Sequence, residues 1–288
     1  MDCNLKDITV HYELFGAGRP MIILHGWSID HRHMVSDMEP IFGQRDGWKR
    51  IYLDLPGHGK TPGKDWITNQ DKILDVVLDF IDAVIPGQRY AVVGASAGAY
   101  LARGVVHHRL ASIDGLLLTV PLIVAEDAKR QVPAHVTLVT ESNLMSTLES
   151  DEVDGLFQSA VVQNRKVADY VRNNFSSANE IGDQAFQAKI REHPENYAFS
   201  FDVDTLPKPC PAPTLIVMGR QDSWVGYRDA WEILDNYPRG TFVVLDRSGH
   251  FLGVEQEDLF HDLVGEWLDR VEQYTREARS VLDYQQTA

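Results

Sequence analysis

The chain has 288 residues, of which 44% are hydrophobic and 24% charged, as in globular proteins that fold around one large core. Its formal net charge is −15 and it has no basic cluster. This composition argues against nucleic acid or an anionic membrane surface as a partner, because binding to either requires lysine or arginine to neutralise phosphate.

The start of the chain and its cysteines indicate the compartment. The N-terminal residues lack a charged start followed by an apolar run, so we expect no signal peptide. Apolar stretches stay well short of the roughly 20 residues that span a bilayer. Cys3 and Cys210 lie far apart and form no CxxC pattern, which favours free thiols in a reducing cytoplasm. We therefore expect a cytoplasmic protein.

Short apolar runs recur along the chain and end in glycine, proline or a polar residue. The first, residues 8–16, alternates apolar and polar residues as a half-buried edge strand does. The others are continuously apolar, which is typical of strands buried on both faces of a parallel sheet. They cover residues 20–26, 50–57, 90–96, 115–121, 213–219 and 241–249.

Helical patterns separate these runs. Apolar residues from Ile73 to Val84 follow the spacing of one helical face, and Pro86 and Gly87 end that helix. A second pattern, from Leu259 to Val271, repeats every four residues near the end of the chain. Strands that alternate with helices imply right-handed crossovers. The sequence therefore predicts an α/β fold with a mostly parallel, doubly wound sheet.

One region interrupts the alternation. Between about residues 122 and 204 the sequence is polar and helical in character, without a strong buried strand, and the proline-rich residues 206–213 lead back to the sheet. We interpret this region as a helical cap inserted over one end of the sheet. The predicted domains are a core of residues 1–121 and 207–288 and a cap of residues 122–206.

The pentapeptide GASAG, residues 94–98, joins a predicted strand to a predicted helix. A sharp strand-to-helix turn strains the central residue and crowds its neighbours, so Gly94 and Gly98 would let Ser96 stand exposed at the tip. The N-terminus of the following helix favours developing negative charge there. The motif predicts a nucleophile elbow, although an inert serine in a glycine-lined turn would give the same pattern.

A serine nucleophile needs a base, and the base needs an acid to orient it. Asp222 and His250 follow two consecutive predicted strands, and parallel strands end at the same edge of a sheet as Ser96. The order Ser96, Asp222, His250 is the one that a nucleophile elbow requires. Asp222 could instead cap a helix, and His250 could pack in a loop, but both being accidental is the weaker hypothesis.

An oxyanion hole needs two backbone N–H groups near the nucleophile. The amide of Ala97 directly follows Ser96. The second candidate is the amide of Trp27, because the strand at residues 20–26 ends in His25 and Gly26, and glycine permits close approach. We expect His25 to brace this loop without taking part in the chemistry.

Together these segments resemble the α/β-hydrolase superfamily, in its serine-nucleophile branch with a helical cap. The matching segments appear in the expected order and span most of the chain: LHGWS (24–28), LDLPGHGKT (53–61), GASAG (94–98), GRQDSWV (219–225) and SGHF (248–251). The resemblance implies the α/β-hydrolase fold. A serine at the elbow, where the haloalkane dehalogenase and epoxide hydrolase branches carry aspartate, distinguishes the chain from those branches.

The resemblance and the residues together predict a carboxylesterase-like serine hydrolase with a small-molecule ester or related acyl substrate. A carbon–carbon bond hydrolase of ring-cleavage products, or a lactonase, would use the same triad. A ligand-binding receptor on a hydrolase fold is an alternative function from another class. The sequence also leaves open whether the protein forms a homodimer. We expect neither a metal nor an organic cofactor, since the triad requires none.

Two histidine clusters, His31 with His33 and His107 with His108, could suggest a metal site. Neither has a carboxylate or cysteine at ligand spacing in the sequence, so we expect solvated surface histidines in a loop and at a helix end, respectively. GASAG also lacks the GxGxxG spacing of a dinucleotide-binding turn.

Overall fold

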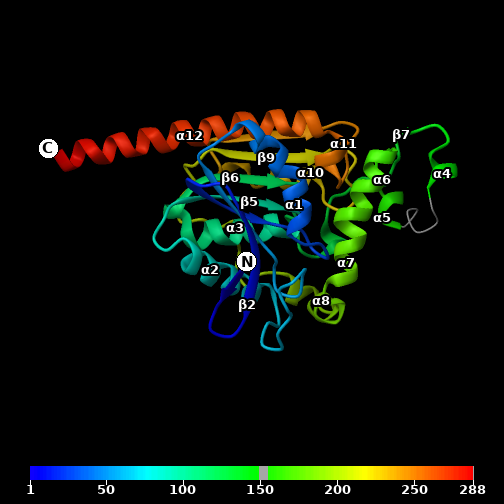
Figure 1. Ribbon diagram of the computed structural model, residues 1–288, viewed down its shortest axis with the longest axis horizontal. Helices are drawn as coiled ribbons and strands as arrows, with labels where there is room; N and C mark the ends of the chain where they lie inside the picture. Colours follow the sequence, from blue (N-terminus) through cyan, green and yellow to red (C-terminus); the bar gives the residue numbers. More distant parts are fainter. Residues whose placement is uncertain (149–154, 288) are drawn as a thin grey trace.

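The computed structural model describes residues 1–148 and 155–287 (Figure 1). Its centre is an eight-stranded sheet with the strand order β1-β2-β4-β3-β5-β6-β9-β10, in which β1, β2 and β4 pair antiparallel and all other neighbours pair parallel. The strands are β1 (Asp2–Asn4), β2 (Thr9–Phe15), β3 (Arg19–Leu24), β4 (Trp48–Leu53), β5 (Tyr90–Ala95), β6 (Ile113–Thr119), β9 (Thr214–Gly219) and β10 (Gly240–Leu245).

The sheet confirms the predicted α/β fold with a mostly parallel sheet, and each predicted strand is present. The strand order reverses between β3 and β5, because β4 lies on one side of β3 and β5 on the other. Ligands of doubly wound sheets bind beyond the carboxyl ends of the strands at such a reversal. The sequence analysis missed β1, a three-residue edge strand with no buried residue.

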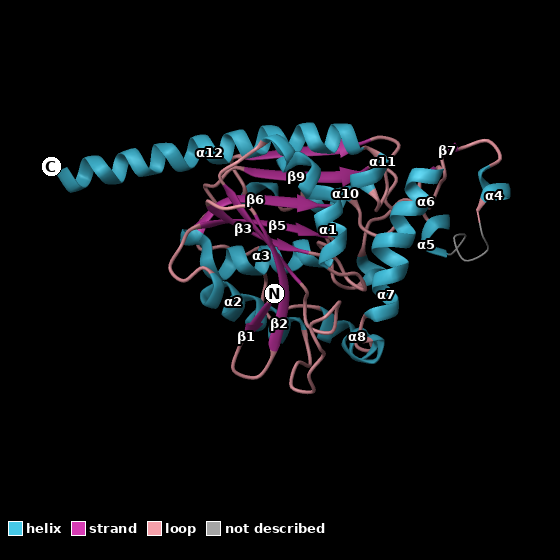
Figure 2. Cartoon of the chain, in the orientation of Figure 1, coloured by secondary structure: helices cyan, strands magenta, loops and turns pink. Residues whose placement is uncertain are grey.

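Helices cover both faces of the sheet (Figure 2). A side chain at Gly115 of β6 would meet Trp267 and Val271 of α12, whereas one at Gly94 of β5 would meet α3 on the opposite face. The predicted helix at residues 73–84 is confirmed as part of α2. The helices of this layer are α1 (His31–Met38), α2 (Gln70–Val84), α3 (Ala97–Arg109), α10 (Tyr227–Trp231), α11 (Leu252–Glu255) and α12 (Glu257–Thr287). None of the described helices is both long and apolar enough to cross a membrane.

The chain between β6 and β9 forms a separate group of elements beside the carboxyl ends of the strands (Figure 1). Two-residue strands β7 (Val139–Thr140) and β8 (Val162–Gln163) pair there. The helices of this insertion are α4 (Leu144–Thr147), α5 (Gly155–Gln158), α6 (Arg165–Val171), α7 (Ser177–Ile181), α8 (Gln184–Arg191) and α9 (Pro194–Tyr197), and a π-helical turn, Arg172–Ser176, joins α6 to α7. The domain boundaries at residues 122 and 206 stay a prediction.

The insertion packs on the core in two ways. Its first part, around α5 to α7, forms a hydrophobic cluster of its own that also takes in Ile29 and Phe251 from core loops. Its last part joins the main core through Phe186, Ile190 and Phe199. The insertion is therefore fixed to the core at both ends.

A buried polar contact links the insertion to α1. The Tyr170 hydroxyl of α6 donates a 2.6 Å hydrogen bond to Asp37 Oδ1 of α1. His33 Nε2 lies 3.5 Å from the other oxygen of Asp37. Burial raises the pKa of Asp37 to about 7.

We predict that Asp37→Asn becomes progressively more stable than the wild type as pH rises. The pKa of Asp37 is 3.8 unfolded and about 7 folded, so the native state keeps a proton that the unfolded chain releases. The contribution of Asp37 to wild-type stability therefore falls through this window by up to about 1.4 kcal/mol per pH unit, whereas asparagine does not titrate.

Urea unfolding of both proteins at pH 5 and pH 7 measures this effect. The difference between the two proteins at each pH removes the contributions of other titrating groups. These include His33, whose pKa burial lowers to about 3. Equal free-energy differences at the two pH values would contradict the assignment.

Candidate active site

Ser96 lies at a sharp turn between β5 and α3. Its backbone has φ 52° and ψ −118°, a conformation in which a residue with a side chain is strained. The flanking glycines make the turn possible by close packing. A Cβ atom at Gly94 would lie 2.4 Å from the Gly98 carbonyl oxygen, and one at Gly98 would lie 2.3 Å from the carbonyl oxygens of Leu24 and His25. The geometry is that expected of a nucleophile elbow.

Asp222 and His250, predicted from separate segments, lie in contact. His250 Nδ1 is 2.8 Å from Asp222 Oδ2, and the Asp222 carboxylate is buried. Its other oxygen accepts hydrogen bonds from the amides of Trp224 and Val225, at 2.8 and 3.0 Å. The carboxylate thus orients the imidazole and also holds its own loop, but it does not cap a helix, since the N-cap of α10 is Gly226. An Nδ1–H bonded to Asp222 leaves Nε2 of His250 unprotonated and able to act as a base.

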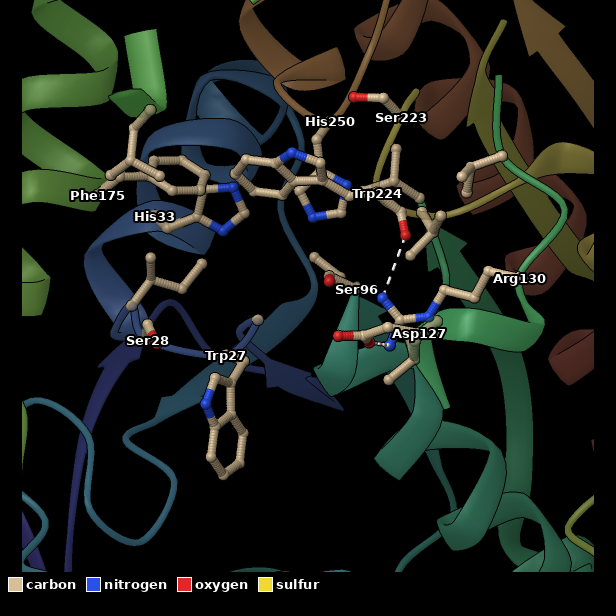
Figure 3. Close-up of a pocket in the computed structure, with 18 of the residues that line it drawn as sticks. Trp27, Ser28, His33, Ser96, Asp127, Arg130, Phe175, Ser223, Trp224 and His250 are labelled. Atoms are coloured by element: carbon tan, nitrogen blue, oxygen red, sulfur yellow. Dashed lines mark hydrogen bonds and ion pairs between the residues drawn. The ribbon is translucent and has the colours of Figure 1, made fainter. Parts of the chain in front are cut away.

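Ser96 and His250 line the same cavity (Figure 3), which has a volume of about 650 Å³. This size suits a small organic ligand. Its wall combines apolar residues of core and insertion with a few polar groups, and includes Ile29, Ala95, Val120, Leu122, Phe175 and Trp224. The Trp224 ring lies 4.6 Å from the His250 ring, centroid to centroid, so it limits how far the imidazole can turn.

The two amides predicted for an oxyanion hole lie on either side of the elbow. A Cβ atom at Gly26 would lie 3.3 Å from Ser96 Cβ, which places the Trp27 loop against the nucleophile. Across the residues that the structure describes, neither the Trp27 nor the Ala97 amide has a hydrogen-bond acceptor. Unpartnered amides beside a nucleophile are available to a developing oxyanion. Their role stays a prediction.

His25 braces this loop, as expected. Its Nδ1 lies 2.7 Å from the Gly26 carbonyl oxygen, and its Nε2 accepts a 3.0 Å hydrogen bond from the Leu55 amide. Both ring nitrogens are therefore occupied by the backbone. Burial lowers the pKa of His25, which keeps the ring neutral.

The expectation of surface positions for His31 and His33 was wrong. Both belong to α1 and are buried, because that helix packs on β3 and β4. His31 Nδ1 lies 2.7 Å from Asp54 Oδ1, a carboxylate 23 positions away that no local spacing could indicate. Burial alone would raise the pKa of Asp54, but the hydrogen bond from His31 lowers this pKa to about 2. His33 lines the cavity.

The second cluster lies at a helix end, as the sequence indicated, but only His108 is exposed, and His107 is half-buried. His107 and His108 end α3, where their rings contact Phe201. They are not among the residues that line the cavity.

Two residues that the sequence analysis missed fix the insertion near the site. The Arg130 guanidinium donates to the carbonyl oxygens of Val124, Ala125 and Trp224. Glu255 accepts hydrogen bonds from the amide of Gly249, next to His250, and from the amides of Val161 and Val162 in the insertion, at 2.6, 2.7 and 3.2 Å. Their partners are backbone groups, which every residue has, so the sequence does not reveal them.

Comparison with known proteins agrees with this fold. A family profile described as "Alpha/beta hydrolase family" matches residues 21–263. The chain belongs to this family. Its membership confirms the resemblance noted in the sequence, and esterase and hydrolase relatives make the protein a hydrolase enzyme.

The relatives differ in their named reactions. A pimeloyl-[acyl-carrier protein] methyl ester esterase of Legionella pneumophila (strain Corby) is 21% identical, over 91% of this chain and 100% of its own. A 2-hydroxy-6-oxo-6-(2'-aminophenyl)hexa-2,4-dienoic acid hydrolase of Metapseudomonas resinovorans is 24% identical, over 96% and 92%. A solved α/β superfamily hydrolase from Oenococcus oeni PSU-1 is 28% identical, with a TM-score of 0.84 over 94% of this chain and 99% of its own.

We predict that Ser96→Gly is more stable than Ser96→Ala. Glycine relieves the positive φ at the elbow, which costs about 1–3 kcal/mol, whereas alanine retains the strain. Glycine also gives the unfolded chain more conformational entropy, which offsets part of the stability gained by relieving the strain. We therefore expect Ser96→Gly to be more stable than Ser96→Ala by about 1 kcal/mol. Urea unfolding of the two variants at one pH measures it. If alanine proved equally stable, the elbow would not be a site of stored strain.

Proposed function

We propose that this enzyme is a serine hydrolase that cleaves a small-molecule ester or related acyl compound through an acyl-enzyme. The observation that carries the proposal is the Asp222–His250 hydrogen bond at the cavity that Ser96 also lines. The strained backbone of Ser96 and the unpartnered amides of Trp27 and Ala97 support it.

In the acylation half, His250 Nε2 removes the proton from Ser96 Oγ as the oxygen attacks the substrate carbonyl carbon. The carbonyl oxygen gains negative charge, which the amides of Trp27 and Ala97 stabilise. His250, now an imidazolium, is stabilised by the ionised Asp222. It then donates its proton to the leaving alkoxide, the carbon–oxygen bond breaks, and an alcohol departs.

In the deacylation half, water replaces the alcohol. His250 Nε2 takes a proton from water, and the resulting hydroxide attacks the acyl carbon. The bond to Ser96 Oγ breaks, and the serine recovers its proton from His250. The products are a carboxylic acid and regenerated enzyme, so the cycle needs no redox partner.

Hydrolysis of a carbon–carbon bond in an acidic ring-cleavage product is the second candidate. The cavity wall carries two guanidinium groups, Arg130 and Arg191, that share one carboxylate, Asp127. This excess of positive charge favours a substrate with an anionic group. The dienoic acid hydrolase relative supports the same candidate by its name.

We predict that Ser96→Ala abolishes both turnover and covalent labelling by a fluorophosphonate probe. Ser223→Ala is the matched control, because Ser223 also lines the cavity but lies outside the elbow. Labelling should persist in that control. Loss of labelling in Ser223→Ala alone would place the nucleophile at position 223.

We further predict that Asp222→Asn lowers kcat about 10³- to 10⁴-fold with little change in KM, because the amide no longer stabilises the imidazolium or fixes its tautomer. Steady-state kinetics on the best substrate of a panel of p-nitrophenyl esters, lactones and dienoic acids measures it. Sustained turnover rather than a single burst separates catalysis from ligand binding alone. Turnover of dienoic acids without turnover of esters would favour the second candidate.

A further inference from the structure

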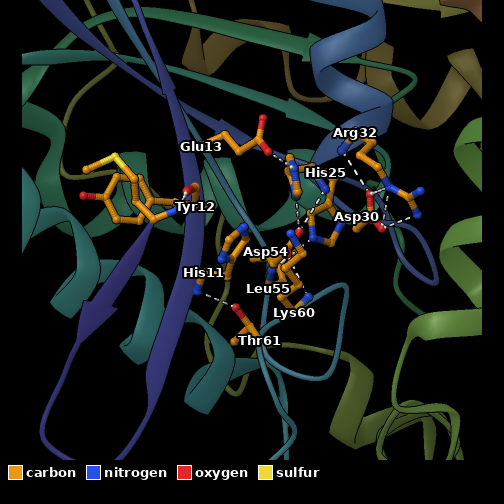
Figure 4. Close-up of polar contacts among 12 residues, drawn as sticks. His11, Tyr12, Glu13, His25, Asp30, Arg32, Asp54, Leu55, Lys60 and Thr61 are labelled. Carbon is orange, nitrogen blue, oxygen red and sulfur yellow. Dashed lines mark hydrogen bonds and ion pairs between the residues drawn. The ribbon is translucent and has the colours of Figure 1, made fainter.

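A second group of polar side chains lies where β2 meets the start of α1 (Figure 4). His11 and Glu13 are two residues apart on β2, so their side chains leave the same face of the strand. His31 is the first residue of α1. None of the three is among the residues that line the cavity.

The three side chains converge. His31 Nε2 lies 3.3 Å from Glu13 Oε1, and the rings of His11 and His31 are 5.7 Å apart, centroid to centroid. One ligand atom from each of the three residues lies within 4.8 Å of the others. Around a tetrahedral metal ion with bonds of about 2.0 Å, ligand atoms are about 3.3 Å apart. Glu13 and His31 already have this spacing, and the His11 side chain would need to move closer to both.

Both imidazoles are held in the orientation of metal ligands. His11 Nδ1 lies 2.9 Å from Asp2 Oδ1, and His31 Nδ1 lies 2.7 Å from Asp54 Oδ1. Because a carboxylate accepts, each Nδ1 carries hydrogen and each Nε2 can present a lone pair to a metal. A histidine ligand usually donates its other N–H to a carboxylate in this way.

One ring nitrogen of the cluster lacks a partner within the part of the chain that the structure describes. His11 Nε2 is buried and has no hydrogen-bond partner among the described residues. His31 Nε2 faces the Glu13 carboxylate, and either a proton or a metal ion can link these two atoms.

The backbone around the cluster is also fixed. The Thr61 hydroxyl accepts a 2.9 Å hydrogen bond from the His11 amide, and Asp54 accepts from the amides of His31 and Lys60, at 3.0 and 2.8 Å. Glu13 is 41% exposed at its side chain, so an ion can reach the cluster from solvent. The site is therefore both supported and accessible.

We propose that His11, Glu13 and His31 form a binding site for a divalent transition-metal ion, with Zn²⁺ the best match and water in the fourth position. Two imidazoles and one carboxylate suit Zn²⁺, whereas Mg²⁺ and Ca²⁺ prefer oxygen ligands. The ion would join strand β2 to α1 and so stabilise the fold without entering the catalytic cycle.

The test uses the full-length, untagged enzyme after removal of metal by EDTA. Zn²⁺ is titrated in competition with a chromophoric chelator, Co²⁺ is added as a spectroscopic probe, and Tm is measured with and without Zn²⁺. We expect one Zn²⁺ per chain, a visible Co²⁺ spectrum typical of tetrahedral coordination, and a Tm increase that EDTA reverses. Mg²⁺ should produce none of these effects.

The variants His11→Gln and Glu13→Gln should each weaken Zn²⁺ binding at least tenfold and remove the Tm increase. His193→Gln, which removes an exposed histidine elsewhere, is the matched control and should bind as the wild type does. Asp2→Asn, which alters only the support of His11, should weaken binding by a smaller factor. Circular dichroism verifies that each variant is folded. Absence of stoichiometric Zn²⁺ binding, or equal binding by Glu13→Gln and His193→Gln, would overturn the proposal.

Discussion

Close backbone packing between β3, β5 and α3 is the constraint on which the rest of the active site depends. Gly98 lies so near the carbonyl oxygens of Leu24 and His25 that no side chain fits between them. This contact sets the Ser96 turn directly against the loop that carries Trp27. A second close approach of this kind lies at the end of β9, where a Cβ atom at Gly219 would lie 2.4 Å from the Gly249 carbonyl oxygen. Glycines thus bring the Ser96 turn against the Trp27 loop, and the Asp222 loop against the His250 loop.

A single buried carboxylate organises the other side of the β3 loop. Asp54 accepts hydrogen bonds from the His31 ring, from the His31 amide and from the Lys60 amide. Burying an ionised carboxylate is costly unless such partners surround it. Gly59, with φ +50°, lets the turn wrap this closely, since a Cβ there would lie 2.4 Å from Asp54 Oδ2. The turn of residues 54–61 therefore anchors α1, and α1 carries His33 to the cavity.

The parts of the site that the sequence predicted are those with a local cause. Continuous apolar runs located the parallel strands, and residues at the ends of those strands had to meet at one edge of the sheet. Ser96, Asp222 and His250 could therefore be placed near one another without coordinates. The elbow was predictable because its glycines are neighbours in sequence.

What the sequence did not predict depends on contacts between distant segments. The burial of His31 follows from how α1 packs on the sheet, and its partner Asp54 lies on another strand end. Arg130 and Glu255 act on backbone groups, which every residue possesses, so their partners cannot be recognised from residue type. The short strand β1 forms only because β2 offers it an edge.

The Glu255 carboxylate has a consequence for how molecules reach the serine. It accepts hydrogen bonds from the amides of Val161 and Gly249, and Gly249 adjoins His250. If the insertion moved outward at this point, the buried carboxylate would lose the amide donors of Val161 and Val162, at a cost of several kcal/mol. If the carboxylate moved with the insertion, it would displace Gly249 and His250. The Glu255 contacts therefore oppose any outward movement of the insertion beside His250.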